Sequence, residues 1–450
     1  MSSFSRSGRK GLITGKTSSS QDDLTAIREE VKKNEEYSLG LLKEGVKVSF
    51  TNLADFQSWS AEKMRQIGLQ VDEFIVDRKE LANQPASQKT LRENPSALQS
   101  GPNIVGRSNG RESGGGLLLF AHPDKFPETF DWGRKHPDVV ERIGRLFAPG
   151  IADDVSGVTA MLSAVETFRR LGFEQKHDLM AASVLGKQLS VYGTYGLMSR
   201  YEPMDGAIYV HPAESGEGLS ELHIASSGMI EFLIEIEGKV PDTNDYFPIM
   251  FCDSAVSAAD KGVYLFQGLQ AWAAQASGRY RHSGLEDLAG QAFAFLVSRF
   301  TAGAEDRVID IPLRCIMQGA VTFPPNASLA EVQRDFEEAF ALLVERDPWL
   351  DQSHVQLEWG DNMGESVQSD EGSEFLRMAK QVLTEVTGKE PHYYYGHALS
   401  DIRYPLLYWN AQAIGVGPLS GDIGKETEWV DRKQYLDTIV AVTQMMRQVV

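Results

Sequence analysis

Short runs of consecutive apolar residues alternate along the chain with longer segments in which apolar residues recur every three or four positions. The runs have the length of buried strands and lie at residues 117–121, 179–185, 206–210 and 413–416. The longer segments have the spacing of one helix face and lie at residues 54–67, 157–171, 373–387 and 431–450. Strands that alternate with helices in this way predict an α/β fold with a mostly parallel sheet covered by helices.

The pattern changes after residue 225. Residues 229–237 alternate in part between apolar and polar, as half-buried antiparallel strands do. Further helical and strand-like segments follow, at residues 258–276, 308–317, 329–345 and 355–359. We therefore predict an α+β domain at residues 226–361, with two helices on one face of its sheet. It is inserted into the α/β domain, which residues 24–225 and 362–450 form.

The N-terminal segment shows no pattern of buried structure. Residues 1–15 are basic and Ser-rich, and they lack the apolar core of a secretory signal. We predict a flexible tail at residues 1–23, and a charged helix that Asp22 and Asp23 begin with N-cap chemistry. The sequence has no run of about 18 apolar residues, so we expect no membrane span.

Composition narrows the class of partner. The formal net charge is -19, from 44 basic and 63 acidic residues, and this balance argues against nucleic acid or an anionic membrane as the main partner. The two cysteines, Cys252 and Cys315, are too few for a disulfide framework. We therefore expect a reducing, cytoplasmic location and a small-molecule ligand.

Residues with metal-binding chemistry lie at the ends of the predicted strands. His122 and Asp124 follow the first apolar run, and His211 follows the third. Asp153 and Asp154 precede the helix at residues 157–171. Strand ends are the usual place for chemistry in an open α/β sheet.

In order and spacing these motifs resemble the acetylornithine deacetylase, succinyl-diaminopimelate desuccinylase and carboxypeptidase G family of zinc metallohydrolases. The resemblance covers residues 25–450. It rests on segment 102–106 (Pro-Asn-Ile-Val-Gly), His122-x-Asp124, Asp153-Asp154-x-x-Gly157, the inserted domain, and Gly417-Pro418 before Glu428-Trp-Val430. It implies a zinc-exopeptidase-like catalytic domain with an inserted lid, and a homodimer formed through residues within 230–290.

The family holds two zinc ions bridged by one Asp. The resemblance places His122 and His211 as ligands of the first zinc, Asp153 as the bridging carboxylate, and Asp124 as the residue that orients the His122 ring. Two histidines and one carboxylate, with an open coordination position, are sufficient for a catalytic zinc. The first zinc site is therefore complete.

The second zinc site departs from the family pattern. Lys187 stands where the family has its Glu base, and Gln188 stands where it has a Glu ligand. Gly424 replaces the last His ligand, and nearby Asp422 is a weak substitute. After Gly238-Lys239 the chain also lacks the His that the family's inserted domain sends to the active site. We therefore expect at most one zinc per chain, and none if Lys187 takes the metal's place beside Asp153.

Several of these residues keep a second interpretation. Asp153 and Asp154 could cap the helix that follows them. Lys187 could form an ion pair with Asp153 or serve as a functional amine. The run that contains His397, Asp401 and Arg403 could be a capped helix start, or a clamp for a substrate carboxylate, because a guanidinium fits carboxylates.

Two classes of function remain. The first is a metal-dependent or chemically divergent amidohydrolase or deacylase that acts on an amide of a small carboxylate compound. Its classical peptidase activity would be weak, because the Glu base is missing. The alternative is a non-catalytic family member that serves as a binding or scaffold protein. We favour the enzyme, because random erosion does not tend to leave a complete first-metal set.

Overall fold

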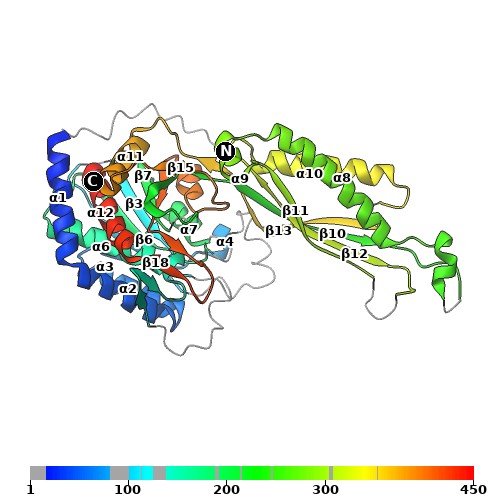
Figure 1. Cartoon of the computed structure of the whole chain (residues 1–450), viewed down its shortest axis with the longest axis horizontal. Helices are drawn as coiled ribbons and strands as arrows, with labels where there is room; N and C mark the ends of the chain where they lie inside the picture. Colours follow the sequence, from blue (N-terminus) through cyan, green and yellow to red (C-terminus); the bar gives the residue numbers. More distant parts are fainter. Residues whose placement is uncertain are drawn as a thin grey trace.

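The computed structural model describes residues 17–81, 101–112, 114–124, 138–187, 192–212, 215–244, 247–303, 308–351 and 353–450. Within these ranges the chain builds two large sheets, one of eight strands and one of four. Figure 1 shows the larger sheet among its helices at one end of an elongated molecule, and the smaller sheet with its two long helices at the other end.

The eight-stranded sheet carries the candidate site. Its order is β1-β2-β6-β3-β7-β16-β8-β15. Four ladders are parallel, namely β6 with β3, β3 with β7, β7 with β16 and β8 with β15. The strands are β1 (Gln70–Phe74), β2 (Asn103–Ser108), β3 (Gly116–Ala121), β6 (Asp178–Ser183), β7 (Gly206–Val210), β8 (Glu221–His223), β15 (His392–Tyr394) and β16 (Gln412–Val416). The mostly parallel sheet predicted from the apolar runs is confirmed.

Helices cover both faces of this sheet. Every residue of β3 and β7 is buried, as expected for strands with a hydrophobic layer on each side. One layer packs around α6, which lies against α12 and α2, and the opposite layer includes α7 and the turn η8. These elements are α1 (Thr17–Lys33), α2 (Glu35–Ser49), α3 (Leu53–Gln66), α4 (Arg78–Leu81), α6 (Ser156–Arg170), α7 (Tyr192–Arg200), η8 (Pro405–Trp409), α11 (Glu374–Thr387) and α12 (Arg432–Val449).

The second large sheet has four strands in the order β11-β12-β10-β13, and its ladders are antiparallel. Buried and half-buried residues alternate along β10, and the buried ones join α8 and α10 in a separate hydrophobic core. A Ser328–Glu331 capping box begins α10. The elements are β10 (Gly228–Glu237), η7 (Pro248–Ser254), α8 (Ala258–Arg279), α9 (Ser283–Ala289), β11 (Ala294–Ala302), β12 (Arg314–Phe323), α10 (Leu329–Arg346) and β13 (Val355–Gly364).

Two small sheets border the eight-stranded sheet. One has the order β17-β18-β5-β4, and the other pairs β14 with β9. The first brings the chain near residue 430 beside the chain near residue 146. The remaining elements are β4 (Val140–Arg142), β5 (Arg145–Phe147), η4 (Ile151–Val155), η6 (Gly218–Ser220), β9 (Ala225–Ser226), β14 (Val367–Gln368), β17 (Ser420–Gly421) and β18 (Trp429–Asp431).

Two sequence-based expectations need correction. The first helix begins at Thr17, so Asp22 and Asp23 lie inside α1 and do not cap it. The strand expected at residues 308–317 is β12, which runs from Arg314 to Phe323 because its pairing with β10 sets its register. No helix in the described part of the chain is both long enough and apolar enough to cross a membrane.

Candidate metal centre and adjoining pocket

Two neighbouring parallel strands and one helical turn bring three predicted ligands together. His122 follows β3, His211 follows β7, and Asp153 lies in η4 just before α6. The Nε2 atoms of His122 and His211 lie 2.9 and 3.1 Å from the same oxygen, Oδ1 of Asp153. All three side chains are buried, and their ligand atoms lie within 4.8 Å of one another.

The Nδ1 atoms of both histidine rings contact backbone oxygens. Nδ1 of His122 lies 3.1 Å from the backbone oxygen of Asp124 and 3.4 Å from its carboxylate. Nδ1 of His211 lies 2.8 Å from the backbone oxygen of Pro212. Contacts with oxygen acceptors require a hydrogen on Nδ1, so in each neutral ring the lone pair is on Nε2. Two lone pairs and a carboxylate oxygen repel one another unless a cation lies between them, and this donor set fits one divalent ion.

Without a metal, protons supply that positive charge. Burial by itself would lower the pKa of His122, but the Asp153 carboxylate, assisted by Asp124, raises the pKa well above its ordinary value. Burial would raise the pKa of Asp153, but Lys187 and His122 bring it well below the usual range. Metal binding at this centre would therefore displace protons.

Asp153 and Asp154 have different roles. Asp153 faces the two histidines, whereas Oδ1 of buried Asp154 accepts a hydrogen bond of 3.0 Å from the amide of Gly157 in the first turn of α6. Burial raises the pKa of Asp154 to about 7. The peptide bond between the two residues is cis. The contact with the start of the helix therefore belongs to Asp154, and the metal-ligand role of Asp153 remains a prediction.

Lys187 lies beside this centre. Its ammonium lowers the pKa of Asp153 more than any other charge does. The same charge also acts on His397 and Asp401. The side chain is half-buried and follows β6 in the chain. The Lys187 ammonium therefore places a positive charge beside Asp153, where the family pattern has a second metal ion.

Of the three other residues expected near a second ion, Gly424 and Asp422 lie in the described part of the chain. Gln188 lies outside the described residues. Gly424 has a positive φ of 75° and no side chain. Asp422 is exposed and binds Thr427 and Lys425, at 3.0 and 3.3 Å. The weak-ligand roles of Gln188 and Asp422 remain predictions.

Glu428 ties two distant loops to the centre. Its side chain is 1% exposed. Oε1 accepts hydrogen bonds from the amides of Ala152 and Asp153, at 2.6 and 2.9 Å. Oε2 accepts one from the amide of Gly424, at 3.1 Å. Burial raises the pKa of Glu428 to about 7. The sequence motif drew attention to this residue, but it did not reveal that Glu428 holds the backbone of a metal ligand.

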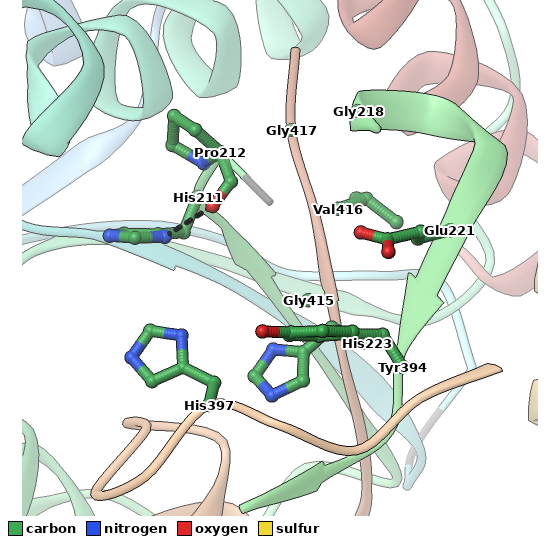
Figure 2. A pocket seen from close by; sticks show the side chains of 10 residues that line it. All are labelled: His211, Pro212, Gly218, Glu221, His223, Tyr394, His397, Gly415, Val416 and Gly417. Atoms are coloured by element: carbon green, nitrogen blue, oxygen red, sulfur yellow. Dashed lines mark hydrogen bonds between the residues drawn. The ribbon is translucent and has the colours of Figure 1, made fainter. Parts of the chain in front are cut away.

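A pocket adjoins the centre on the side of His211 (Figure 2). The ring of His397 stands edge-on to His211, with centroids 5.6 Å apart, and stacks on His223 at 5.2 Å. Figure 2 shows the Tyr394 hydroxyl beside this pair of histidines and Glu221 farther along the wall, where its oxygens accept hydrogen bonds from Ser215 and His392. Pro212, Gly218, Gly415, Val416 and Gly417 complete the lining.

The three residues proposed as a substrate clamp separate in the structure. His397 lies in the pocket lining. Asp401 is fully buried and accepts a hydrogen bond from the Thr194 hydroxyl. Arg403 is 3% exposed, and its guanidinium lies so close to Gly364 that a Cβ there would be 1.8 Å from a terminal nitrogen. Arg403 is therefore buried, and its role in binding a substrate carboxylate remains a prediction.

Sequence reasoning gave no role to Glu221 or His223. The segment Glu-Leu-His at residues 221–223 forms β8, in which both polar side chains share one side of the strand. That alternation was the available signal, but only the parallel pairing with β15 brings Tyr394 beside His223. Tyr394 also lines the pocket.

The fold and this donor set define the class of metal-dependent hydrolases. Residues 118–450 match the model of peptidase family M20/M25/M40, and the chain belongs to that family. A relative from Halalkalibacterium halodurans is 24% identical over 379 residues, which span 75% of this chain and 81% of the relative. That protein is an N-formyl-4-amino-5-aminomethyl-2-methylpyrimidine deformylase. Two of the class assignments made from sequence, the family and its hydrolase chemistry, are confirmed.

Solved structures share the fold. Aminopeptidase PepT from Bacillus cereus superposes with a TM-score of 0.69 at 15% identity, over 92% of this chain and 99% of that chain. The YXEP protein of Bacillus subtilis, a dinuclear metal-binding peptidase from the M20 family, has a TM-score of 0.59 at 12% identity, over 92% and 98% of the two chains. These matches support the shared fold.

Proposed function

We propose that this chain hydrolyses the amide of a small acylated amine, using one divalent ion, with zinc the natural choice, held by His122, Asp153 and His211. The observation that carries the proposal is the convergence of two buried Nε2 atoms on one oxygen of Asp153. The deformylase relative supports the substrate class, because an N-formyl amine is such an amide. A bound ion would supply Lewis acidity to the carbonyl group.

The residues around the ion have separable tasks. Asp124 fixes the His122 ring through Nδ1 and so directs Nε2 inward. Glu428 holds the loop that carries Asp153. Lys187 supplies a fixed positive charge beside Asp153, where the family pattern has a second metal ion. This charge would stabilise the negative charge that develops on the carbonyl oxygen during the reaction. We therefore propose a centre with one metal and one lysine.

The overall reaction adds one water across the amide bond. The C–N bond breaks, the acyl carbon gains a hydroxyl group and the leaving nitrogen gains a proton. A protonated Lys187 cannot accept a proton from water, and the carboxylate base of the family pattern is absent at that position. We therefore expect slower turnover than in the dinuclear relatives, and weak activity on ordinary peptides.

The test combines metal analysis with an assay. Protein purified without chelator should contain up to one zinc per chain and should release formate from N-formyl-4-amino-5-aminomethyl-2-methylpyrimidine. His122→Ala should remove both the metal and the activity. The matched control is His354→Ala, because His354 lies in the turn before β13, against Trp349, and should change neither.

Three results would contradict the proposed one-metal hydrolase. Two metals per wild-type chain would show that the ligands are misassigned. A metal-free and inactive protein would support the non-catalytic alternative. An active protein whose rate is unchanged in His122→Ala would place the chemistry elsewhere.

We also propose a homodimer through residues within 230–290. Within this range α8 exposes Val263, which is 45% accessible, and just beyond it the edge strand β11 exposes Leu296, which is 62% accessible. An exposed edge with apolar side chains is a natural pairing surface. A two-fold dimer is the commonest oligomer.

A further inference from the structure

We propose that Asp401 is a positioning residue, whose carboxylate is the counter-charge that keeps the Lys187 ammonium directed at the metal centre. Asp401 is fully buried, so we assign it to Lys187 rather than to a substrate. The inference rests on the proposed function, because it concerns the lysine that stands beside the same centre. It adds a residue that acts on the reaction through another side chain.

The chain just before Lys187 is packed against the start of α7. The amide of Gly193 donates a hydrogen bond of 2.9 Å to the backbone oxygen of Leu185. Gly186 has a positive φ of 85°, and a Cβ there would lie 2.1 Å from the ring of Tyr192, where α7 begins. The backbone from which Lys187 projects is therefore held by the first turn of α7.

Asp401 is bonded to this first turn of α7. Its Oδ2 accepts a hydrogen bond of 2.5 Å from the hydroxyl of Thr194, and both side chains are buried. The loop that carries Asp401 is fixed from another side, because the amide of Ser400 donates a hydrogen bond of 2.9 Å to the Ser226 hydroxyl. The carboxylate is therefore held beside the segment from which Lys187 projects.

Positive charges offset the second carboxylate oxygen of Asp401. Oδ1 is buried and accepts no hydrogen bond from any residue that the structure describes. Burial raises the pKa of Asp401, whereas the Thr194 hydroxyl and then the Lys187 ammonium lower it. His122 and Arg403 also act on it, but less than Lys187 does. Because a buried carboxylate needs compensating charge, Lys187 is its main counter-charge.

A bound metal ion makes this second carboxylate necessary. Lys187 also lies beside Asp153, the carboxylate that would bind the metal. Once a divalent ion neutralises Asp153, like charges repel the ammonium from the centre. The Lys187 side chain is half-buried and flexible, so it could then turn toward solvent. Asp401, the second carboxylate on which Lys187 acts, would hold it near the metal.

The test is a double-mutant cycle on zinc affinity, measured by competition with a chelating dye. Lys187→Met should tighten zinc binding to the wild type by about tenfold, a factor within the range of couplings between neighbouring charges. In the Asp401→Asn background the same substitution should tighten it by about threefold or less, because the ammonium is no longer held at the centre.

Thr194→Val is the matched control. Asp401→Asn keeps an acceptor for the Thr194 hydroxyl and removes only the charge, whereas Thr194→Val removes the hydrogen bond and keeps the charge. Lys187→Met should therefore have its full effect on zinc affinity in the Thr194→Val background. Urea unfolding of the metal-free samples gives a second reading that needs no zinc. There the midpoint shift of Lys187→Met combined with Asp401→Asn should be smaller than the sum of the single shifts.

An undiminished effect of Lys187→Met in Asp401→Asn would overturn the inference, and so would additive midpoint shifts. An equal reduction in Thr194→Val would also overturn it, because the hydrogen bond rather than the charge would then position Lys187. If Asp401→Asn alone does not fold, its combination with Lys187→Met should fold, and failure of the pair would count against the inference.

The two proposals can fail separately. Coupled charges in a protein that binds zinc but does not hydrolyse the N-formyl substrate would leave the inference standing while the proposed hydrolysis fails. If the protein binds no zinc, the proposed one-metal centre fails and the urea cycle decides the inference. An active zinc enzyme in which the two substitutions are additive would do the opposite.

Discussion

Replacing Glu428 by Gln should weaken metal binding more than it weakens the fold. The carboxylate receives three backbone N–H groups, two on Oε1 and one on Oε2. Glutamine has one oxygen, which can keep the bonds to Ala152 and Asp153. Its NH₂ group must then face the amide hydrogen of Gly424, so that a bond is lost and two donors meet.

The structure sets the size of the effect. One buried N–H left without an acceptor costs about 1–3 kcal/mol. The strained contact relaxes by moving the loops that carry Asp153 and Gly424. Side chains that support metal ligands from behind typically change metal affinity by about 10–100-fold when mutated, and tenfold corresponds to about 1.4 kcal/mol.

The assay is competition for zinc between metal-free protein and a chelating dye, alongside urea unfolding of the same samples. Glu426→Gln is the matched control, because Glu426 is exposed in the same loop. Weaker zinc binding in Glu428→Gln than in Glu426→Gln is the expected result. Unchanged zinc affinity together with a lower free energy of unfolding would refute the reasoning, because Glu428 would then support only the fold.

Three further outcomes are expected. Lys187→Glu combined with Gln188→Glu should raise zinc affinity, and adding Gly424→His should permit a second ion; elemental analysis that finds no gain would contradict this. Burial lowers the pKa of His223 to about 3, so between about pH 6.5 and 3 only the unfolded chain takes up this proton. Stability should therefore fall as pH falls, by roughly 5 kcal/mol at most, and His223→Gln should flatten that dependence in urea titrations. Light scattering should give twice the mass of the chain, and Val263→Glu should give the monomer; a monomeric wild type would rule out the dimer.

The parts of the fold that could be predicted are those in which one strand or helix carries its own signal. The apolar runs that became β3 and β7 are buried on both faces, so their sequence has no polar interruption. The exposed edge strand β11 was missed although an apolar run at residues 292–297 leads into it, because the run stops halfway along the strand, where most residues face solvent. The start of α1 was misplaced because an N-cap pattern at Asp22 also fits a helix interior.

The same distinction applies to the site. His122, Asp153 and His211 could be found because each lies at the end of a predicted element. The contacts of Glu428 join residues 275 and 276 positions apart, and neither loop indicates the other. The pocket likewise depends on β8 pairing with β15, whose residues are separated by 171 positions. The local pattern of apolar and polar residues cannot specify such pairings, because they form only when the whole sheet is assembled.

The order of the sheet has a consequence during synthesis of the chain. His122, Asp153 and His211 are made early, but β7 pairs with β16, and Glu428 holds the Asp153 loop. At about 5–20 residues per second, translation from residue 211 to residue 428 takes roughly 10–40 s. Throughout that interval the nascent chain displays its ligands without the strand and the carboxylate that arrange them. The arranged centre would therefore be able to take up a metal only after residue 428 has been made.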